Sequence, residues 1–205
     1  MTADPSPMVG LAITLIAYII GTVPFGVLVA RGVGASDPRT KGSGNIGSTN
    51  VLRVAGKGAA AATLVLDVGK GLIAVWTAKS WIPDHTTPWI QAAGIAVVLG
   101  HTFPVWTSFR GGKGVATGIG ALFGLSPVLA TGACLVWATV LAWSRYVSLA
   151  SVVAVVVLPI AAAVIRAPNV QTFSLAVAAV VVIRHRDNLF RLLRGTESKL
   201  GSRAT

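Results

Sequence analysis

Long uncharged stretches dominate this chain, and short polar or Pro/Gly-rich breaks separate them. Uncharged runs cover residues 5–30, 114–144, 146–165 and 167–183. A hydrocarbon core of ~30 Å needs about 20 apolar residues per helix, so these runs predict membrane-spanning helices. The predicted spans are Met8–Ala30, Gly58–Ala78, Trp89–Trp106, Gly114–Leu125, Val128–Ser144, Val147–Ile165 and Val170–Ile183.

The run at 114–144 decides the number of crossings. As one helix it would be ~46 Å long, well beyond the hydrocarbon core, and Ser126-Pro127 offers a break. Seven crossings then place 14 lysines and arginines on the side of the C-terminus and 2 on the other side, whereas six crossings divide them 8 to 8. The positive-inside rule therefore favours a seven-transmembrane-helix bundle with the N-terminus outside and the C-terminus cytoplasmic.

The composition agrees with an all-α integral membrane protein that forms one transmembrane domain over residues 1–205. Hydrophobic residues make up 54% of the chain and charged residues 11%, with a mean hydropathy of +0.76. The net charge of +11 would suggest nucleic acid in a soluble protein, but here it marks cytoplasmic loops, so we expect a lipid bilayer and no nucleic acid as partner. The single cysteine, Cys134, and the scattered carboxylates predict neither a disulfide framework nor a metal site.

The first polar run, GSGNIGSTNVLR at Gly42–Arg53, contains a G-x-G-x-x-G pattern. A dinucleotide-binding fingerprint would need a preceding strand, whereas a transmembrane helix and a basic loop precede this one. The glycines let backbone amides form a concave anion nest, and Arg53 can form a bidentate fork with phosphate. A polar loop with turn chemistry is the alternative interpretation. The side chains that can donate to phosphate oxygens are Ser43, Asn45, Ser48, Thr49 and Asn50.

The second polar run, FRGGKG at Phe109–Gly114, opens the predicted span Gly114–Leu125. Its amides and a helix dipole can therefore point at the same place as the charge of Lys113. It is not a Walker loop, because Thr107 stands where that spacing requires glycine. The alternative interpretation is a flexible break between two helices, with cations that snorkel to the membrane surface. The candidate phosphate-binding residues of this run are Arg110, Gly111, Gly112, Lys113 and Gly114.

Three ionisable residues fall inside predicted spans. Asp67 and Lys70 lie three residues apart on one helix face, and His101 lies near the inner end of another helix. Charged groups in a membrane are costly enough to face the bundle interior and to pair with each other or with a ligand. We interpret all three as residues that support the site or the structure, with a direct role for Asp67 and Lys70 left open.

The third polar run, HRDNLFRLLRGTESK at His185–Lys199, follows the last span. On a helix, His185, Asn188 and Arg191 share a face, so their side chains can point into one opening. Glu197 follows them in the sequence. A basic tail attracted to anionic lipid is the alternative interpretation. We prefer that interpretation for Arg184, Arg186, Arg194 and Arg203.

Together the three polar runs resemble the signature motifs of the bacterial acyl-phosphate:glycerol-3-phosphate acyltransferases. The first resembles GSGN-x-G-x-TN-x-x-R, and the second, with the preceding GHTFP, resembles GH-x-FP followed by FKGGKGVAT. The third resembles HR-x-N-x-x-RL-x-x-G-x-E-x-K, and LDVGKG at Leu66–Gly71 also matches. The departures keep charge or small size: Ile46 for proline, Ser48 for alanine and Arg110 for lysine.

The resemblance implies transfer of a fatty acyl group from acyl phosphate to the 1-hydroxyl of sn-glycerol 3-phosphate, giving lysophosphatidate and phosphate without a cofactor. It also implies a site that faces the cytoplasm of a bacterial inner membrane, and a soluble enzyme that supplies acyl phosphate is an expected partner. His185 is the most plausible side-chain base, with a phosphate oxygen of the donor as the alternative. Asn188 and Ser43 join it as catalytic candidates, although we favour a binding role for Ser43 because no base lies beside it in the sequence.

A transporter of a phosphorylated metabolite is the rival class. It predicts inverted repeats and a binding site in the middle of the membrane. The sequence contains no convincing internal repeat, and the three polar runs are predicted at one surface. These features favour the enzyme.

Overall fold

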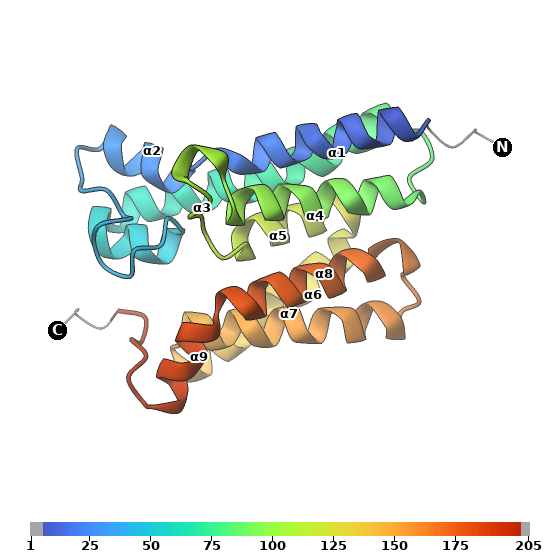
Figure 1. Cartoon of the computed structure of the whole chain (residues 1–205). Coiled ribbons are helices and arrows are strands. Elements are labelled where there is room, and N and C mark those ends of the chain that lie inside the picture. The colour runs from blue at the N-terminus through green and yellow to red at the C-terminus, as the bar shows by residue number, and fades with distance from the viewer. Residues whose placement is uncertain (1–5, 202–205) are drawn as a thin grey trace.

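The computed structural model describes residues 6–201, and over them it is built from helices and turns without a strand. In Figure 1, α1–α5 lie together above α6–α9, with the helices roughly along one direction. The elements are α1 (Pro7–Thr22), α2 (Phe25–Gly32), α3 (Ser48–Trp81), α4 (Pro88–Thr102), the 3₁₀ turn η1 (Val105–Thr107), α5 (Val115–Leu125), α6 (Pro127–Ser144), α7 (Val147–Val164), α8 (Pro168–Arg184) and α9 (Arg186–Leu193).

The prediction of an all-helical membrane protein is confirmed at this level. Five helical segments are long and apolar enough to cross a bilayer: Pro7–Gly32, Ser48–Trp81, Pro88–Thr107, Pro127–Ser144 and Val147–Val164. Two shorter apolar helices, α5 and α8, complete the set of predicted spans. Pro127 is the first residue of α6, so the run at 114–144 is indeed two helices.

The expectation of one helix over Met8–Ala30 is wrong. The helix stops at Thr22, Val23 adopts an extended conformation (φ −63°, ψ 115°), and α2 begins after Pro24. Proline lacks an amide hydrogen and disfavours helical backbone in the residue before it, which explains the break. The side-chain Nζ of Lys70 on α3 donates to the carbonyl of Val23, which the break leaves without a helical partner (2.9 Å).

Two further boundaries differ from the prediction. Helix α3 begins at Ser48, ten residues before the predicted span, and Gly56 (φ +83°) divides it at a kink. Helix α4 ends at Thr102, and the predicted residues up to Trp106 form a turn around Pro104. The third polar run contains α9, which supports the helical reading of that segment.

Glycines bring α3 and α5 into close contact, and this contact sets the position of the second polar run. A Cβ on Gly120 would lie 1.9 Å from the carbonyl oxygen of Val68, and one on Gly71 would lie 2.1 Å from that of Thr117. The backbones can approach this closely only because both residues lack a side chain. The start of α5 is thereby held beside α3, and Leu122 further along α5 is buried in the core.

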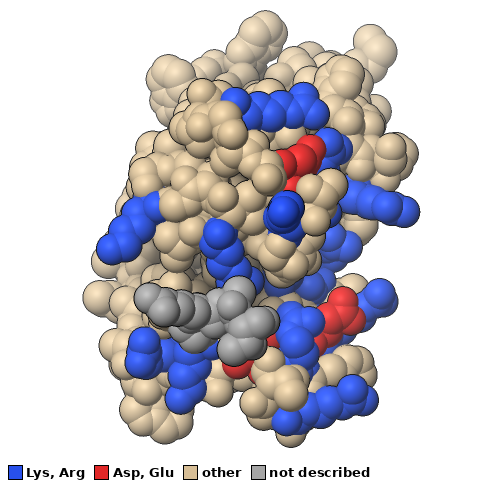
Figure 2. Space-filling model, turned by 90° about the vertical axis from the view of Figure 1, so that its left-hand side faces the viewer, with Lys and Arg blue, Asp and Glu red and all other residues tan. Residues whose placement is uncertain are grey.

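The polar ends of the elements gather at one end of the bundle. Figure 1 shows α2, α9 and the C-terminal segment at the same end, with the N-terminal end of α1 at the other. Figure 2 looks onto that end and shows many lysine and arginine side chains and few acidic ones. The three polar runs thus lie close enough to share one opening.

Candidate active site

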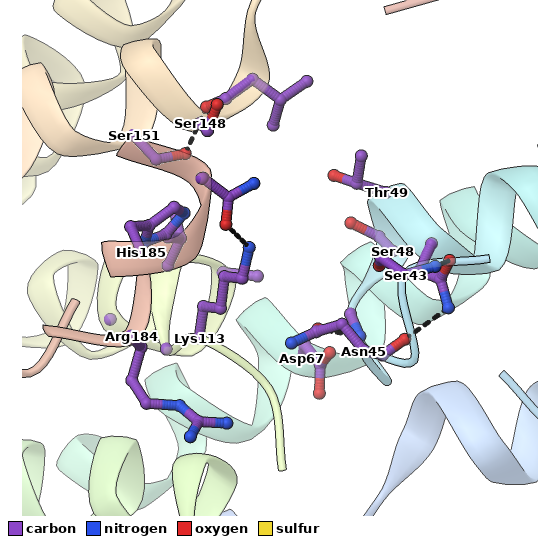
Figure 3. Close-up of a pocket in the computed structure, with 18 of the residues that line it drawn as sticks. Ser43, Asn45, Ser48, Thr49, Asp67, Lys113, Ser148, Ser151, Arg184 and His185 are labelled. Atoms are coloured by element: carbon purple, nitrogen blue, oxygen red, sulfur yellow. Dashed lines mark hydrogen bonds between the residues drawn. The ribbon is translucent and has the colours of Figure 1, made fainter. Parts of the chain in front are cut away.

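All three polar runs line one pocket of about 2180 Å³. In Figure 3, Ser43, Asn45, Ser48 and Thr49 lie on one wall, and Lys113 and His185 lie opposite them. Lys70 and Gly112 are the two predicted site residues that do not line it. The predicted residues that do are Ser43, Asn45, Thr49, Asn50, Arg53, Asp67, His101, Arg110, Gly111, Lys113, Gly114, His185, Asn188, Arg191 and Glu197.

Asn50 organises the first polar run from inside. Its Oδ1 accepts the amide of Ser43 (2.8 Å), and its Nδ2 lies 2.8 to 3.1 Å from the carbonyl oxygens of Pro38, Lys41 and Asn45. The side chain is buried and its hydrogen-bonding groups are engaged by the loop. The side chain of Asn50 therefore holds its own loop together, which differs from the phosphate-binding role expected for it.

The start of α3 offers amide donors to the pocket. The backbone amides of Ser48 and Thr49 make no hydrogen bond within residues 6–201, because these residues lie in the first turn of the helix. Arg53 is exposed one turn later and lines the same pocket. This part of the site therefore has the unpaired amides, the positive end of a helix dipole and the cation that a phosphate group needs.

The second polar run uses its glycines differently from the prediction. The amide of Gly111 donates to the carbonyl of Thr102 (3.1 Å), and the amide of Gly112 donates to that of His101 (3.0 Å). Those two amides are therefore not phosphate donors, which corrects the role expected for them. The amides of Lys113 and Gly114 make no hydrogen bond within the described residues, and Gly114 (φ +88°) turns the chain into α5.

A hydrogen-bonded chain links the second and third polar runs. Lys113 donates to Oδ1 of Asn188, and Nδ2 of Asn188 donates to Oε1 of Glu197 (2.6 Å). Glu197 also accepts from Ser148 (2.8 Å) and Arg191 (2.7 Å). Although burial opposes it, these hydrogen bonds lower the pKa of Glu197, so it remains a carboxylate.

Burial, together with the charges of nearby arginines, lowers the pKa of Lys113 to about 8, although the charge of Glu197 opposes the shift. Lys113 is therefore still mostly charged at neutral pH, and it is less strongly solvated than a surface lysine. Such an ammonium group interacts more strongly with an incoming anion than an exposed one does.

His185 lies between α8 and α9 and is buried in the pocket wall. Its Nδ1 lies 2.8 Å from the carbonyl oxygen of Val181. Because a carbonyl can only accept, Nδ1 carries the proton of the neutral ring and Nε2 keeps a lone pair. Burial, with the charge of Lys113, lowers the pKa of His185 to about 4, so the ring is neutral at physiological pH.

Asp67, Lys70 and His101 form a buried cluster behind the second polar run. Nζ of Lys70 lies 2.8 Å from Oδ1 of Asp67 and 2.9 Å from Nδ1 of His101. The ring of His101 packs against Gly112, where a Cβ would lie 1.9 Å from Nε2. The cluster thus packs against the loop that carries Lys113. The supporting role expected for its three residues stays a prediction.

Arg184 is a site residue that we did not expect. The sequence placed it with the lipid-attracted tail, but its side chain lines the pocket and donates to the carbonyl of Gly111 (3.2 Å). The available signal was its position, since it occupies the last helical turn immediately before His185. Charge alone does not reveal which way such a residue faces.

The pocket continues from its polar end into an apolar part between α3, α5, α6, α7 and α8. Along α7 its lining runs from Val147 to Leu158, which is ~17 Å of helix. The apolar lining includes Leu64, Val68, Ile119, Leu122, Phe123, Trp137, Val155, Leu158, Phe173 and Val177. A ligand with a charged head and a hydrocarbon tail matches this division.

These features define a multi-pass helical membrane protein with a cationic pocket for an amphipathic, phosphate-bearing ligand. Among the lining residues, eight lysines and arginines face three acidic residues. Several negative charges can therefore be neutralised in one place.

Comparison with known proteins gives the family. The family model for glycerol-3-phosphate acyltransferase matches residues 11–195, so the chain belongs to this family, as its motifs suggested. A glycerol-3-phosphate acyltransferase of Jannaschia sp. (strain CCS1) is 46% identical over 187 residues, which are 91% of each chain.

Solved structures agree with the family assignment. The chain resembles the crystal structure of PlsY, an integral membrane glycerol 3-phosphate acyltransferase, in its glycerol 3-phosphate form. The TM-score is 0.89 at 39% identity, over 94% of this chain and 96% of that one. The lysophosphatidic acid form gives a TM-score of 0.84 at 37% identity, over 94% and 95%.

Proposed function

We propose that this protein transfers a fatty acyl group from acyl phosphate to the 1-hydroxyl of sn-glycerol 3-phosphate, giving lysophosphatidate and inorganic phosphate. The observation that carries the proposal is the single pocket lined by all three polar runs and extended by an apolar groove. The glycerol 3-phosphate and lysophosphatidic acid named for the similar structures support the acceptor and the product. The motifs support acyl phosphate as the donor.

The reaction requires neutralisation of negative charge more than activation of a bond, because acyl phosphate is a mixed anhydride with a stable leaving group. The hydroxyl oxygen of the acceptor attacks the acyl carbon, and the bond from that carbon to the phosphate oxygen breaks. The leaving phosphate takes the electron pair. Two phosphorylated reactants repel each other in a site of low dielectric constant, and Arg53, Arg110 and Lys113 offset that repulsion.

The hydroxyl proton must leave as the new bond forms. Nε2 of neutral His185 is the proposed acceptor, since Nδ1 already donates to the carbonyl of Val181, and a phosphate oxygen of the donor is the alternative acceptor. We assign Ser43 to substrate binding, because its hydroxyl makes no hydrogen bond to a base within residues 6–201. The acyl chain occupies the apolar groove between the helices.

We further propose that the chain is one domain with seven crossings, an outer N-terminus and a cytoplasmic site in a bacterial inner membrane. The gathering of cationic ends in Figure 2 supports this orientation. A soluble enzyme that supplies acyl phosphate would approach from the same side, and the reaction needs no cofactor. A transporter would instead bind its substrate in the middle of the membrane.

The test is a comparison of acyl donors with the purified protein in detergent. Acyl phosphate, acyl-CoA and acyl carrier protein are each offered with glycerol 3-phosphate, and lysophosphatidate and free phosphate are measured. We expect equal amounts of both products with acyl phosphate and little product with the other donors. Flux of glycerol 3-phosphate into proteoliposomes without chemistry would contradict the proposal and favour the transporter.

A further inference from the structure

Arg184 connects the end of α8 to the second polar run. Its Nη2 donates to the carbonyl oxygen of Gly111 (3.2 Å), and its guanidinium lies 5.7 Å from the centre of the Phe103 ring. Its Nε is buried and has no hydrogen-bond partner within the described residues. A half-buried guanidinium that is fixed on two sides differs from a cation that extends toward lipid headgroups.

The contact with Gly111 gives one peptide group hydrogen bonds at both of its polar ends. The peptide between Gly111 and Gly112 has its carbonyl held by Arg184 and its amide held by the carbonyl of His101. Because a peptide is planar, fixing both of its polar ends fixes its orientation. The next residue along the chain is Lys113, so this peptide sets the direction in which the ammonium group enters the pocket.

Arg184 also contributes charge at the place where the two functional side chains meet. Lys113 is faced by Glu197, Arg191, Arg184 and Arg53, and all of these except Glu197 disfavour its protonated form. His185 is faced by Lys113, Glu197 and Arg184, and both cations favour its neutral form. In Figure 3 the Arg184 side chain extends away from the His185 ring and the end of Lys113, toward Gly111 and Phe103, so its charge acts on them without direct contact.

We infer that Arg184 is a positioning residue for the acyl transfer: it fixes the peptide that precedes Lys113 and adds a positive charge near Lys113 and His185. The inference rests on the proposed function. It does not require that Arg184 touch a substrate. It predicts two separable effects, one from the hydrogen bond of the guanidinium and one from its charge.

The test uses Arg184→Gln, Arg184→Lys and the control Arg194→Gln. Arg194 is exposed beyond α9 and does not line the pocket, so the control removes one positive charge from the same segment. Steady-state rates with glycerol 3-phosphate are measured from about pH 6 to 9.5. Thermal unfolding in detergent is recorded for each variant.

Arg184→Gln should raise KM about tenfold or more and move the alkaline limb of kcat/KM to higher pH, because loss of the neighbouring charge raises the pKa of Lys113. Arg184→Lys keeps the charge, so it should leave the limb in place. It should still raise KM, because an ammonium group differs in shape from the guanidinium that holds the carbonyl of Gly111. Arg194→Gln should change neither.

Wild-type KM for both Arg184 variants, or equal movement of the limb by Arg184→Gln and Arg194→Gln, overturns the inference. If Arg184→Gln does not fold, Arg184→Lys decides alone, since a wild-type KM for it refutes the hydrogen-bonding role. Failure of the wild type to acylate glycerol 3-phosphate would refute the proposed function instead. The two failures are therefore distinguishable.

Discussion

Lys113 donates a hydrogen bond to Asn188 across 75 positions of the sequence. Because the amide nitrogen of Asn188 donates to Glu197, its oxygen must face Lys113. The carboxylate of Glu197 thus orients the amide, and the amide in turn holds the ammonium group. Residues from two distant polar runs act as one unit in the pocket.

This unit predicts an alkaline limb in the rate profile. Burial lowers the pKa of Lys113 to about 8, so its positive charge is present below that pH and is lost as the pH rises through it. We expect kcat/KM to fall above about pH 8. In Lys113→Arg the guanidinium stays charged, so the limb should vanish while the maximum falls about tenfold, because the two cations differ in shape. An unchanged limb in Lys113→Arg would refute Lys113 as its origin.

Gly112→Ala tests the support of the second polar run. The added methyl would lie 1.9 Å from Nε2 of His101, whose ring is held by Lys70 and cannot give way cheaply. Overpacking of this kind costs about 1–3 kcal/mol, so we expect lower thermal stability and a loss of activity of at least tenfold. Gly132→Ala is the control, because a Cβ there meets nothing within 4 Å. Equal behaviour of the two variants would show that the loop tolerates displacement.

Asn50→Ala tests the organisation of the first polar run. The change removes the acceptor of the Ser43 amide and the donor shared by three carbonyl groups. Leaving such buried groups unpaired costs about 1–3 kcal/mol, which should lower the unfolding temperature and raise KM for glycerol 3-phosphate. Asn169→Ala, at an exposed position at the start of α8, is the matched control. A higher KM at unchanged stability would instead indicate direct contact with substrate.

Much of the architecture follows from local sequence, because hydrocarbon length and helix rise leave few ways to arrange long apolar runs. The meeting of the three polar runs also follows, since each lies at a helix end and the charge pattern assigns all of them to one side. The break at Pro24 was missed because hydropathy averages over a single proline. Its consequence, the hydrogen bond from Lys70 to the carbonyl of Val23, requires knowledge of which helices are neighbours.

The finer roles depend on tertiary contacts that composition does not encode. Gly111 and Gly112 have the residue type of an anion nest, yet the last turn of α4 already occupies their amides. Asn50 has the residue type of a phosphate ligand, yet its side chain turns into its own loop. Arg184 has the residue type of a lipid anchor, yet it lines the pocket and its guanidinium bonds the second polar run. In each case the sequence gives the residue type, but it does not reveal the direction in which the group points.

His185→Ala separates the two possible proton acceptors. Loss of a general base typically costs 10²–10⁴-fold in rate, so we expect kcat to fall by at least about 100-fold with little change in KM. The exposed His85, in the loop between α3 and α4, provides the control, and His85→Ala should retain full activity. Product is measured as lysophosphatidate formed from acyl phosphate at about pH 7.5, where the low pKa of His185 keeps its ring neutral. If His185→Ala keeps its rate within about threefold, the phosphate oxygen of the donor is the base, and His185 serves the site by position alone.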